Sequence, residues 1–575
     1  MTRVFDDPRQ FASDGLAGLA QAYPERIARI PGGVVRSTIS PDDQVALVIG
    51  GGSGHFPAFS GWVGPGLAHG AVCGQVFASP SASQAYSVCR AADNGGGVVL
   101  AYGNYAGDVL HFGQAAERLR AEGVDVRTLA VSDDVASNTP ENSHDRRGTT
   151  GDLFVFKVAA AASERGYTLD EVERVASRAN ERTRSLGIAF EGCTLPGATE
   201  PLFTVPAGQM SVGLGVHGEP GIREVPLGTA AEIADLLFDG VQAEEPPRDA
   251  DYSGRAVVLL NGLGTVKYEE LHIVYAHIAR RLTQAGITPV LPEVGELMSS
   301  LDMAGMSLTI AYLDAELEEL WADPVDTIAL RRGGVSVRPA RTLAESSATD
   351  DLPVPAATEA SQAQAAVLAD VLAVINQTAL AAETELGKLD AVAGDGDHGQ
   401  GMSFGSTAAA ASAREALAAG AGARTLLVRA GDAWSEGAGG TSGALWGAAL
   451  TAVGGGLSDS AAADASGVVA AVNAGIDAIL RLGGAQVGDK TMVDALVPFR
   501  QELASAVETT SSLAEAWGRA AQAATQAAGA TSRIAARRGR SRVLGDKSVG
   551  TADPGATSAA LLLTALANSG LLRCR

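Results

Sequence analysis

Two patterns of hydrophobic and polar positions follow one another along the chain, and the change comes near residue 337. Up to that point, short apolar runs that suit buried strands alternate with stretches of helical periodicity and with glycine turns. The apolar runs lie at residues 44–50, 96–103, 124–135, 255–264 and 306–314. Buried strands that alternate with helices are typical of α/β folds. The pattern therefore predicts an α/β domain over residues 1–337.

The second pattern begins after a segment without periodicity. Residues 338–360 gather Pro, Ser, Thr and Asp, a composition that is typical of an interdomain linker. Beyond them the sequence is rich in alanine, and apolar residues recur at helical spacing, as at Val367 and Val371. We therefore predict a linker over residues 338–361 and a nearly all-helical domain over residues 362–575.

Size and charge limit the classes of function. With 575 residues, the chain is too long for one hydrophobic core, so two or three domains are expected. Its net charge of −23 argues against binding of nucleic acid or an anionic membrane through a general basic surface. A phosphorylated ligand would have to be bound locally, by backbone amides, metal ions or single arginines.

Cysteine usage and the N-terminal residues bear on the compartment. The four cysteines are widely spaced and form neither a disulfide framework nor a zinc pattern. The first ten residues carry charge where a signal peptide needs an apolar core, and no apolar run looks long enough to span a bilayer. We expect a cytoplasmic protein.

Three carboxylates are crowded near the end of the first predicted helix of the second domain. Asp390, Asp395 and Asp397 stand among glycines in KLDAVAGDGDHG, and those glycines predict a loop. Such carboxylates repel one another unless a cation neutralises them, and an oxygen-only ligand set suits magnesium or calcium rather than zinc. An EF-hand is excluded because Gln400 and Ser406 occupy the positions of its glycine and its last glutamate. Magnesium bridging nucleotide phosphates fits this pattern, and a solvated acidic turn is the alternative.

Other glycine-rich loops of the second domain carry groups that suit phosphate. Residues 437–447, GAGGTSGALWG, open into an apolar helix, and its N-terminus offers free amides and the hydroxyls of Thr441 and Ser442. The loop GDKTMVDAL follows, and a third loop at 539–558 contains Arg540 as a fixed positive charge. The sequence contains no Walker A pattern. Each loop alone could be an ordinary turn, but together with the carboxylates they predict a nucleotide pocket at one end of a helical bundle.

The first domain carries different chemistry after its strands. The run VIGGGSGHF places glycines and His55 after a strand, where backbone amides can bind a small polar ligand, although the spacing is not that of a dinucleotide fingerprint. Asp108 follows the next strand as a candidate base at the carboxyl edge of the sheet. His217 lies between glycines in SVGLGVHGEPG. A structural role explains either histidine equally well on these grounds.

Together these motifs resemble the dihydroxyacetone kinase family, in the ATP-dependent form that fuses a ketone-binding domain to a helical nucleotide domain. GGGSGH, NYAGDVLHFG, GVHGEPG, GDGDHG, GGTSGALWG and DPGATS follow in the family's order over nearly the whole chain. The resemblance implies an N-terminal α/β domain of two subdomains and a C-terminal all-α helical barrel. It also implies a homodimer formed through the first domain.

The resemblance implies a role for each matching residue. In the family, a histidine that matches His217 attacks the ketone carbonyl and holds the substrate as a covalent hemiaminal. His55 and Asp108 match residues that polarise the substrate and take the proton of the hydroxyl that receives phosphate. The implied substrate contacts are Gly52, Ser53, Gly54, His55, Gly103 and Asp108, and the implied nucleotide contacts are His398, Gly399, Gln400, Gly401, Thr441, Ser442, Gly483, Met492, Arg540 and Asp553. Asp390, Asp395 and Asp397 match carboxylates that hold two magnesium ions, so ATP and Mg²⁺ are the expected cofactors.

Departures from the family pattern bear on the substrate. Where the usual motif reads Gly-His-Glu-Pro-Ala-His, this chain has GHFPAF, so Phe56 and Phe59 replace a glutamate and a histidine. Core packing beside Trp62 is the alternative role for these two phenylalanines. Gly103 stands where a lysine usually precedes Asn-Tyr. These changes resemble the kinases that act on the four-carbon ketose erythrulose.

The expected function is therefore ATP-dependent phosphorylation of a terminal hydroxyl of a small ketose, erythrulose rather than dihydroxyacetone, without nucleic-acid or membrane partners. Dihydroxyacetone kinase proper is the first alternative. A phosphotransfer relay is the second, although its two domains are normally separate chains. A ketone-sensing regulator is the third, although it could dispense with the magnesium carboxylates that this chain contains.

Overall fold

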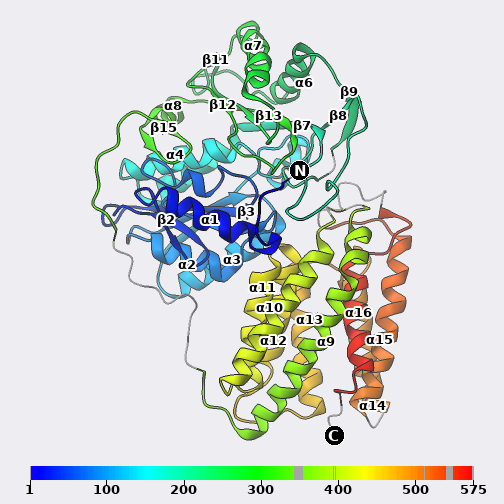
Figure 1. Cartoon of the computed structure of the whole chain (residues 1–575). Coiled ribbons are helices and arrows are strands. Elements are labelled where there is room, and N and C mark those ends of the chain that lie inside the picture. Colours follow the sequence, from blue (N-terminus) through cyan, green and yellow to red (C-terminus); the bar gives the residue numbers. More distant parts are fainter. Residues whose placement is uncertain are drawn as a thin grey trace. The chain divides into compact units, whose positions relative to one another are not determined.

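The computed structural model describes residues 2–219, 221–341, 354–392, 394, 396–509, 512–538 and 548–572, and structural statements refer to these residues. The chain forms two compact units, Met1–Thr349 and Asp350–Arg575, which are described separately (Figure 1). The first unit contains two large sheets with helices, and the described part of the second contains helices without strands. The predicted combination of an α/β domain and an all-α domain is confirmed.

The first sheet has six strands in the order β1-β2-β4-β3-β5-β6. Its strands are β1 (Ile27–Ile30), β2 (Gly33–Arg36), β3 (Ala46–Ser53), β4 (Gly70–Val76), β5 (Val98–Gly103) and β6 (Val126–Val131). β4, β3, β5 and β6 are parallel neighbours, while β1 and β2 complete the sheet in antiparallel pairing. The apolar runs at 44–50, 96–103 and 124–135 thus form three adjacent parallel strands.

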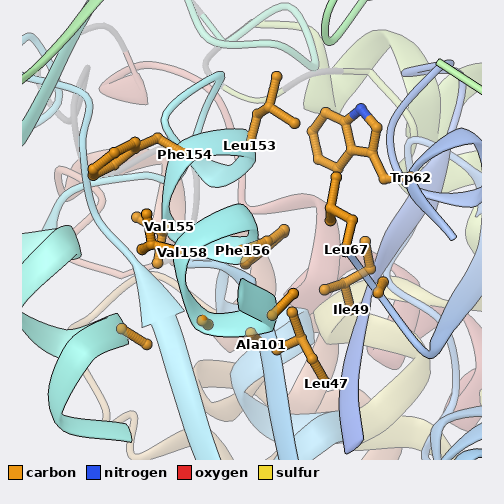
Figure 2. Packing of buried hydrophobic residues seen from close by; sticks show 14 of the residues in the cluster. Leu47, Ile49, Trp62, Leu67, Ala101, Leu153, Phe154, Val155, Phe156 and Val158 are labelled. Carbon is orange, nitrogen blue, oxygen red and sulfur yellow. The ribbon is translucent and has the colours of Figure 1, made fainter. Parts of the chain in front are cut away.

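Helices cover both faces of this sheet because successive side chains of a buried strand point to opposite faces. Leu47 and Ile49 of β3 pack in one cluster with α4 (Asp152–Glu164) and α5 (Leu169–Glu181). Figure 2 shows Leu47 and Ile49 near Phe156 of α4. Ala46 and Val48 pack in another cluster with α2 (Ala82–Ala92) and α3 (Ala106–Ala121). Burial on both faces explains why β3 reads as a continuous apolar run.

The second sheet contains the later apolar runs and is mainly antiparallel. Its strands are β7 (Thr183–Glu191), β8 (Gln209–Val212), β9 (Arg223–Pro226), β10 (Arg255–Gly262), β11 (Thr288–Pro289), β12 (Glu293–Gly295) and β13 (Ala304–Tyr312). The order is β11-β10-β13-β7-β8-β9, with β12 also paired to β10. The helices α6 (Ala230–Gln242) and α7 (Tyr268–Gln284) cover its core. The first unit is completed by α1 (Phe11–Ala22), α8 (Ala315–Ala322) and a short hairpin of β14 (Val325–Asp326) and β15 (Arg331–Arg332).

The glycine run in VIGGGSGHF differs in part from the expectation that it follows the strand. β3 continues to Ser53, so Gly50 and Gly51 lie inside the strand. A Cβ atom at Gly50 would come within 2.7 Å of the Val72 Cβ, and one at Gly51 within 2.5 Å of the Phe59 ring. These two glycines therefore allow close packing inside the domain, and the loop begins only after Ser53.

The second unit is a ring of antiparallel helices. They are α9 (Glu359–Asp390), α10 (His398–Ala418), α11 (Ala423–Ala438), α12 (Gly440–Gly455), α13 (Ala465–Gly483), α14 (Val493–Thr509), α15 (Leu513–Ala530) and α16 (Pro554–Asn568). Each helix contacts the next, and α16 contacts α9, so the described helices close into the predicted barrel (Figure 1). Because consecutive helices run in opposite directions, every second connection lies at the same end of the barrel.

Two of these helices correct an expectation about apolar length. By length and composition, α9 and α13 could each cross a membrane, which corrects the expectation that no apolar run is long enough. Both helices contact their neighbours in the ring, α9 with α10 and α16, and α13 with α12 and α14. Core helices of other proteins pass the same test, so two such helices are weak evidence for membrane spans.

The residues at the two ends of the predicted linker belong to regular parts of the structure. Ala340 forms a bridge with Thr38, and the backbone N–H of Arg341 donates to the carbonyl of Ser37 (2.7 Å). At the other end, α9 begins at Glu359. Both contacts of residues 338–341 lie within the first unit.

Candidate functional site

The predicted site residues of the first unit meet at the carboxyl edge of its parallel strands. His55 follows β3, and Asp108 lies in the first turn of α3, which follows β5. Because β3 and β5 are neighbours, the residues that follow them come together. Asp108 is buried, and its carboxylate accepts a hydrogen bond from the hydroxyl of Ser79 (2.7 Å).

His55 is held in one tautomer by a backbone contact. Its Nδ1 lies 2.9 Å from the carbonyl oxygen of Ser299. Because a carbonyl can only accept, Nδ1 carries the proton and Nε2 keeps its lone pair. Burial, aided by the nearby His217, lowers the pKa of His55 to about 3. The buried Nε2 has no hydrogen-bond partner within the described residues, so it is available as a base or acceptor toward a ligand.

His217 reaches the same place from the loop after β8 of the second sheet. Its Nδ1 lies 3.2 Å from Oε1 of Glu219, and its backbone N–H donates to Oε2 of the same carboxylate (3.0 Å). Both side chains are buried. The carboxylate accepts the Nδ1 proton, which leaves Nε2 unprotonated. This is the form of the imidazole that can attack a carbonyl carbon.

Aromatic rings hold the two imidazoles against each other. The His217 ring centroid lies 4.8 Å from that of His55 and 4.6 Å from that of Tyr105, with nearly perpendicular planes. Phe77 stacks on His55 at 5.0 Å and meets the edge of His217 at 5.5 Å. Such packing restricts rotation of the rings, so their nitrogen atoms keep fixed directions.

Glu219 is a site residue that the sequence analysis missed. A Cβ atom at Gly215 would come within 2.0 Å of Oε2 of Glu219 and 2.7 Å of Nη1 of Arg147, so the glycine leaves room for both groups. Arg147 forms an ion pair with the buried Asp134 (2.7 Å). The signal in the sequence was a carboxylate two positions after the candidate nucleophile in GVHGEPG, but only geometry shows that it contacts the ring.

The remaining predicted substrate contacts are small residues with different amounts of space. A Cβ atom at Gly52 would come within 2.8 Å of the Ala78 nitrogen, and Gly54 has a φ of +101°, so neither position suits another residue. The hydroxyl of Ser53 donates to the carbonyl of Gly74 (2.6 Å). Gly103 ends β5, and a Cβ atom there would meet its nearest neighbour, the Tyr105 ring, at 3.3 Å. Gly103 is therefore the roomier position.

The two phenylalanines of GHFPAF have different environments. Phe59 is buried and packs edge-on against Trp62, with ring centroids 6.0 Å apart. Phe56 is 48% exposed, and its carbonyl accepts a hydrogen bond from Ser299. Phe59 thus has the core-packing role that was the alternative for both.

In the second unit, the predicted metal and phosphate residues begin at the α9–α10 connection. Asp390 ends α9, and its Oδ2 accepts a hydrogen bond from the backbone N–H of Gly396 (2.9 Å). Asp397 occupies the N-cap position of α10, and the adjacent His398 contacts the hydroxyl of Ser558 on α16 (2.9 Å). Asp395 and Arg540 lie outside the described residues.

The other predicted nucleotide contacts share that end of the barrel. Gly399, Gln400 and Gly401 lie in the first turn of α10, Thr441 and Ser442 in the first turn of α12, Gly483 at the end of α13, Met492 just before α14, and Asp553 at the N-cap of α16. These positions all belong to the α9–α10 connection or to every second connection after it. The barrel topology therefore brings these positions to one end, and their role as nucleotide contacts stays a prediction.

Charge at this end of the barrel suits a cation. Burial, with the charges of Asp494 and Asp390, raises the pKa of Asp553 to about 7. Mutual repulsion of this kind is relieved by a bound cation, and the oxygen-only donors Asp390 and Asp397 fit Mg²⁺. Within the described residues, which exclude Asp395, no group of three His, Cys, Asp or Glu side chains is close enough to hold a metal.

Comparisons with known proteins cover both units. The Dak1 domain model matches residues 17–329, and the DAK2 domain model matches residues 392–568. The L-erythrulose 1-kinase of Mycolicibacterium smegmatis is 61% identical over 98% of this chain and 99% of its own length. The L-erythrulose kinase of Pectobacterium atrosepticum is 53% identical over 98% of this chain and 96% of its own, and the D-erythrulose kinase of M. smegmatis is 50% identical over 99% and 98%.

A solved structure agrees with these matches. The crystal structure of the dihydroxyacetone kinase from C. freundii in complex with AMP-PNP and Mg²⁺ covers 99% of both chains, with 31% identity and a TM-score of 0.52. The chain therefore belongs to the dihydroxyacetone kinase family, and within it to the subgroup of the erythrulose kinases.

Proposed function

We propose that the protein is an ATP-dependent kinase that phosphorylates a terminal hydroxyl of L-erythrulose while the ketose is held covalently on His217. The observation that carries the proposal is the pair of buried imidazoles, with ring centroids 4.8 Å apart, whose Nδ1 atoms both have acceptors. Two of the erythrulose kinase relatives are named for the L-enantiomer, at 61% and 53% identity, and one for the D-enantiomer, at 50%. That ranking favours L-erythrulose.

Capture of the ketose begins with attack of His217 Nε2 on the ketone carbon. As the N–C bond forms, the carbonyl π pair moves to oxygen, which takes a proton from a water molecule, and the resulting hydroxide passes to bulk solvent. The imidazole becomes positively charged, and the carboxylate of Glu219 offsets this charge at Nδ1, 3.2 Å away. A polyol of similar shape has no carbonyl and cannot form the adduct, so the step selects ketoses by chemistry.

Phosphoryl transfer follows at a terminal hydroxyl of the bound ketose. The hydroxyl oxygen attacks the γ-phosphorus of ATP, the bond to ADP breaks, and the hydroxyl proton passes to His55 Nε2 or to Asp108. Asp390, Asp395 and Asp397 would hold Mg²⁺, which neutralises charge on the phosphates. The residues of the barrel end bind and orient the nucleotide.

Several finer features belong to the same proposal. We expect two magnesium ions, a homodimer formed through the first domain, a cytoplasmic location, and no nucleic-acid or membrane partner. We also place the domain boundaries at residues 1–337, 338–361 and 362–575, as the composition of the chain indicates. The division of the structure into units at Thr349 and Asp350 supports a boundary within the linker.

An assay coupled to ADP release tests the function directly. With ATP and Mg²⁺ present, kcat/KM is measured for L-erythrulose, D-erythrulose and dihydroxyacetone. We expect L-erythrulose to exceed dihydroxyacetone by roughly tenfold to two-hundredfold, which is what one well-accommodated group contributes. A ratio at or below one would favour dihydroxyacetone as the substrate, and glycerol should give no turnover.

A second measurement tests the adduct without turnover. Erythrulose labelled with ¹³C at the ketone carbon is added to the protein in the absence of ATP. The carbonyl resonance should be replaced by that of a tetrahedral carbon in protein-bound ketose. A bound ketose that keeps its carbonyl resonance would exclude the hemiaminal.

A further inference from the structure

Asp152 is a buried carboxyl group that the chemistry above does not use. It is the first residue of α4 and is 1% exposed, and neither carboxyl oxygen has a hydrogen-bond partner in the described part of the chain. Burying an unpartnered carboxyl group is costly, so such groups are rare without a functional reason. The nearby Asp133 shows the usual arrangement, because it accepts hydrogen bonds from Thr149 and Gly151.

The position of Asp152 links it to the ketose site. A Cβ atom at Gly103 would lie 3.5 Å from Oδ2 of Asp152 and 3.3 Å from the ring of Tyr105. That ring meets the edge of His217 at 4.6 Å. A group beside Gly103 would therefore lie within contact distance of both Asp152 and a ring that touches the proposed nucleophile.

The charge state of Asp152 suits a hydroxyl ligand. Burial raises its pKa well above the ordinary value, and the neighbouring carboxylates Asp133 and Asp108 raise it further. A protonated carboxyl group can donate one hydrogen bond and accept another. A hydroxyl group offers the same pair of roles, so the two groups can satisfy each other.

A purely structural role would make different demands on Asp152. Acidic residues in the first helical turn stabilise a helix through its macrodipole or by accepting backbone N–H groups. Among the described residues, no backbone N–H donates to the carboxyl oxygens of Asp152. A structural role also predicts that removing the carboxyl group would affect all substrates alike.

We propose that Asp152 is a specificity-determining residue that binds the terminal hydroxymethyl group present in erythrulose and absent from dihydroxyacetone, in the space beside Gly103. The inference rests on the proposed function. Dihydroxyacetone, with one carbon fewer, leaves this carboxyl group without a partner. In the family that the chain resembles, a lysine usually stands at the position of Gly103. Such a side chain would fill the space and contact Asp152.

The test compares Asp152→Ala with Asp152→Asn. The alanine variant should lower kcat/KM for L-erythrulose by about 10- to 100-fold and change the value for dihydroxyacetone by less than about threefold. The asparagine variant keeps a donor and an acceptor, and should stay within about fivefold of the parent for both ketoses. Equal losses for both ketoses in Asp152→Ala, or no loss for either, would overturn the assignment.

Two further variants guard against a folding defect. Asp133→Asn changes a buried carboxylate whose partners are all within the protein, and should lower thermal stability without changing the ratio between the ketoses. Gly103→Lys places a long side chain in the same space, and should lower kcat/KM for L-erythrulose more than for dihydroxyacetone. An unchanged ratio in Gly103→Lys would count against the proposal even if Asp152→Ala does not fold.

Binding separates this inference from the proposed kinase function. The affinity of the parent and of Asp152→Ala for each ¹³C-labelled ketose is measured without ATP. Absence of phosphorylation with selective loss of erythrulose binding would refute the kinase and keep the role of Asp152. Phosphorylation of erythrulose with unchanged binding selectivity in the variant would keep the kinase and refute the role of Asp152.

Discussion

The two units prepare their reactive groups in different ways. In the first unit, buried hydrogen bonds to Ser299 and Glu219 set the tautomers of His55 and His217 before any ligand arrives. In the second unit, acidic residues gather at one end of a helical barrel, where burial, with the charges of Asp494 and Asp390, raises the pKa of Asp553 to about 7. Covalent capture of a ketose would require one imidazole nitrogen with a free lone pair. Binding of nucleotide phosphates at the acidic barrel end would require Mg²⁺, which accompanies the nucleotide.

The two sites also differ in the backbone elements that contribute their residues. The proposed ketose site combines strand ends of two sheets with a loop, so residues far apart in the chain meet there. At the barrel end, each contributing residue that the structure describes lies at or next to a helix terminus, and Lys490 holds the last connection by donating to the carbonyls of Ile534 (3.0 Å) and Thr551 (2.8 Å). Changes in the barrel should therefore affect turnover, and changes in the first unit should affect capture.

The largest expected effect comes from the barrel. Asp397→Asn removes the charge of a proposed magnesium ligand, and kcat should fall by at least about 1,000-fold because transition-state charge loses several kcal/mol of stabilisation. Formation of the ketose adduct, followed by ¹³C NMR without ATP, should be unchanged. Parental turnover of the variant at saturating Mg²⁺ would break the proposed division of labour.

A matched control is available at the other end of the barrel. Asp464 also caps a helix, α13, and its side chain accepts the backbone N–H of Gly467 (2.8 Å). Asparagine caps helices nearly as well as aspartate. Asp464→Asn should therefore keep both turnover and stability close to those of the parent.

The corresponding change in the first unit is His217→Ala. It should abolish the adduct and lower kcat/KM by about 100- to 1,000-fold, because the substrate is no longer fixed for transfer. Binding of an ATP analogue in the presence of Mg²⁺ should persist, as measured by calorimetry. The exposed His144 gives the control, since His144→Ala should leave activity unchanged. An adduct resonance that survives in His217→Ala would contradict the assigned nucleophile.

A smaller effect is expected from Glu219→Gln. The amide oxygen can still accept the Nδ1 proton of His217, but it cannot offset the positive charge that develops on the ring. We expect kcat/KM to fall by about 10- to 100-fold for both ketoses, with their ratio unchanged and with less adduct at equilibrium. A change in the ratio would instead place Glu219 in direct contact with the distinguishing part of the substrate.

The smallest effect concerns acid stability. The pKa of His55 is about 3 in the folded protein because the ring is buried, against about 6.5 in an unfolded chain. Between these values the unfolded state binds the additional proton, so stability decreases as pH falls from 6 to 4. His55 should contribute about 1.4 kcal/mol of this loss per pH unit.

His55→Asn removes this contribution while leaving a donor for the Ser299 carbonyl. Chemical denaturation at pH 6, 5 and 4 should therefore show the free-energy difference between parent and variant shrinking as the pH falls. Parallel curves for the two proteins would mean that His55 is protonated in the folded state over this range.

Much of the fold could be predicted because its signals are local. β3, β5 and β6 coincide with apolar runs, and the loop after α9 with the glycines at 394 and 396. The direction of strand pairing could not be predicted, because an apolar run is compatible with either direction. For that reason the runs at 255–264 and 306–314 did not reveal a second, mainly antiparallel sheet.

The candidate site, like the fold, could be predicted only in part from the sequence. The sequence by itself determined which chemistry is available, because histidines, carboxylates and glycine loops can be read directly at His55, His217 and Asp390. Only the tertiary structure decided which nitrogen of each histidine is free, because its hydrogen-bond acceptor comes from folding, as when Ser299 meets His55 across 244 positions of the chain. The tertiary structure also decided that Asp152 is buried beside Gly103. These two residues are distant in the sequence and become neighbours only because α4 packs on the sheet.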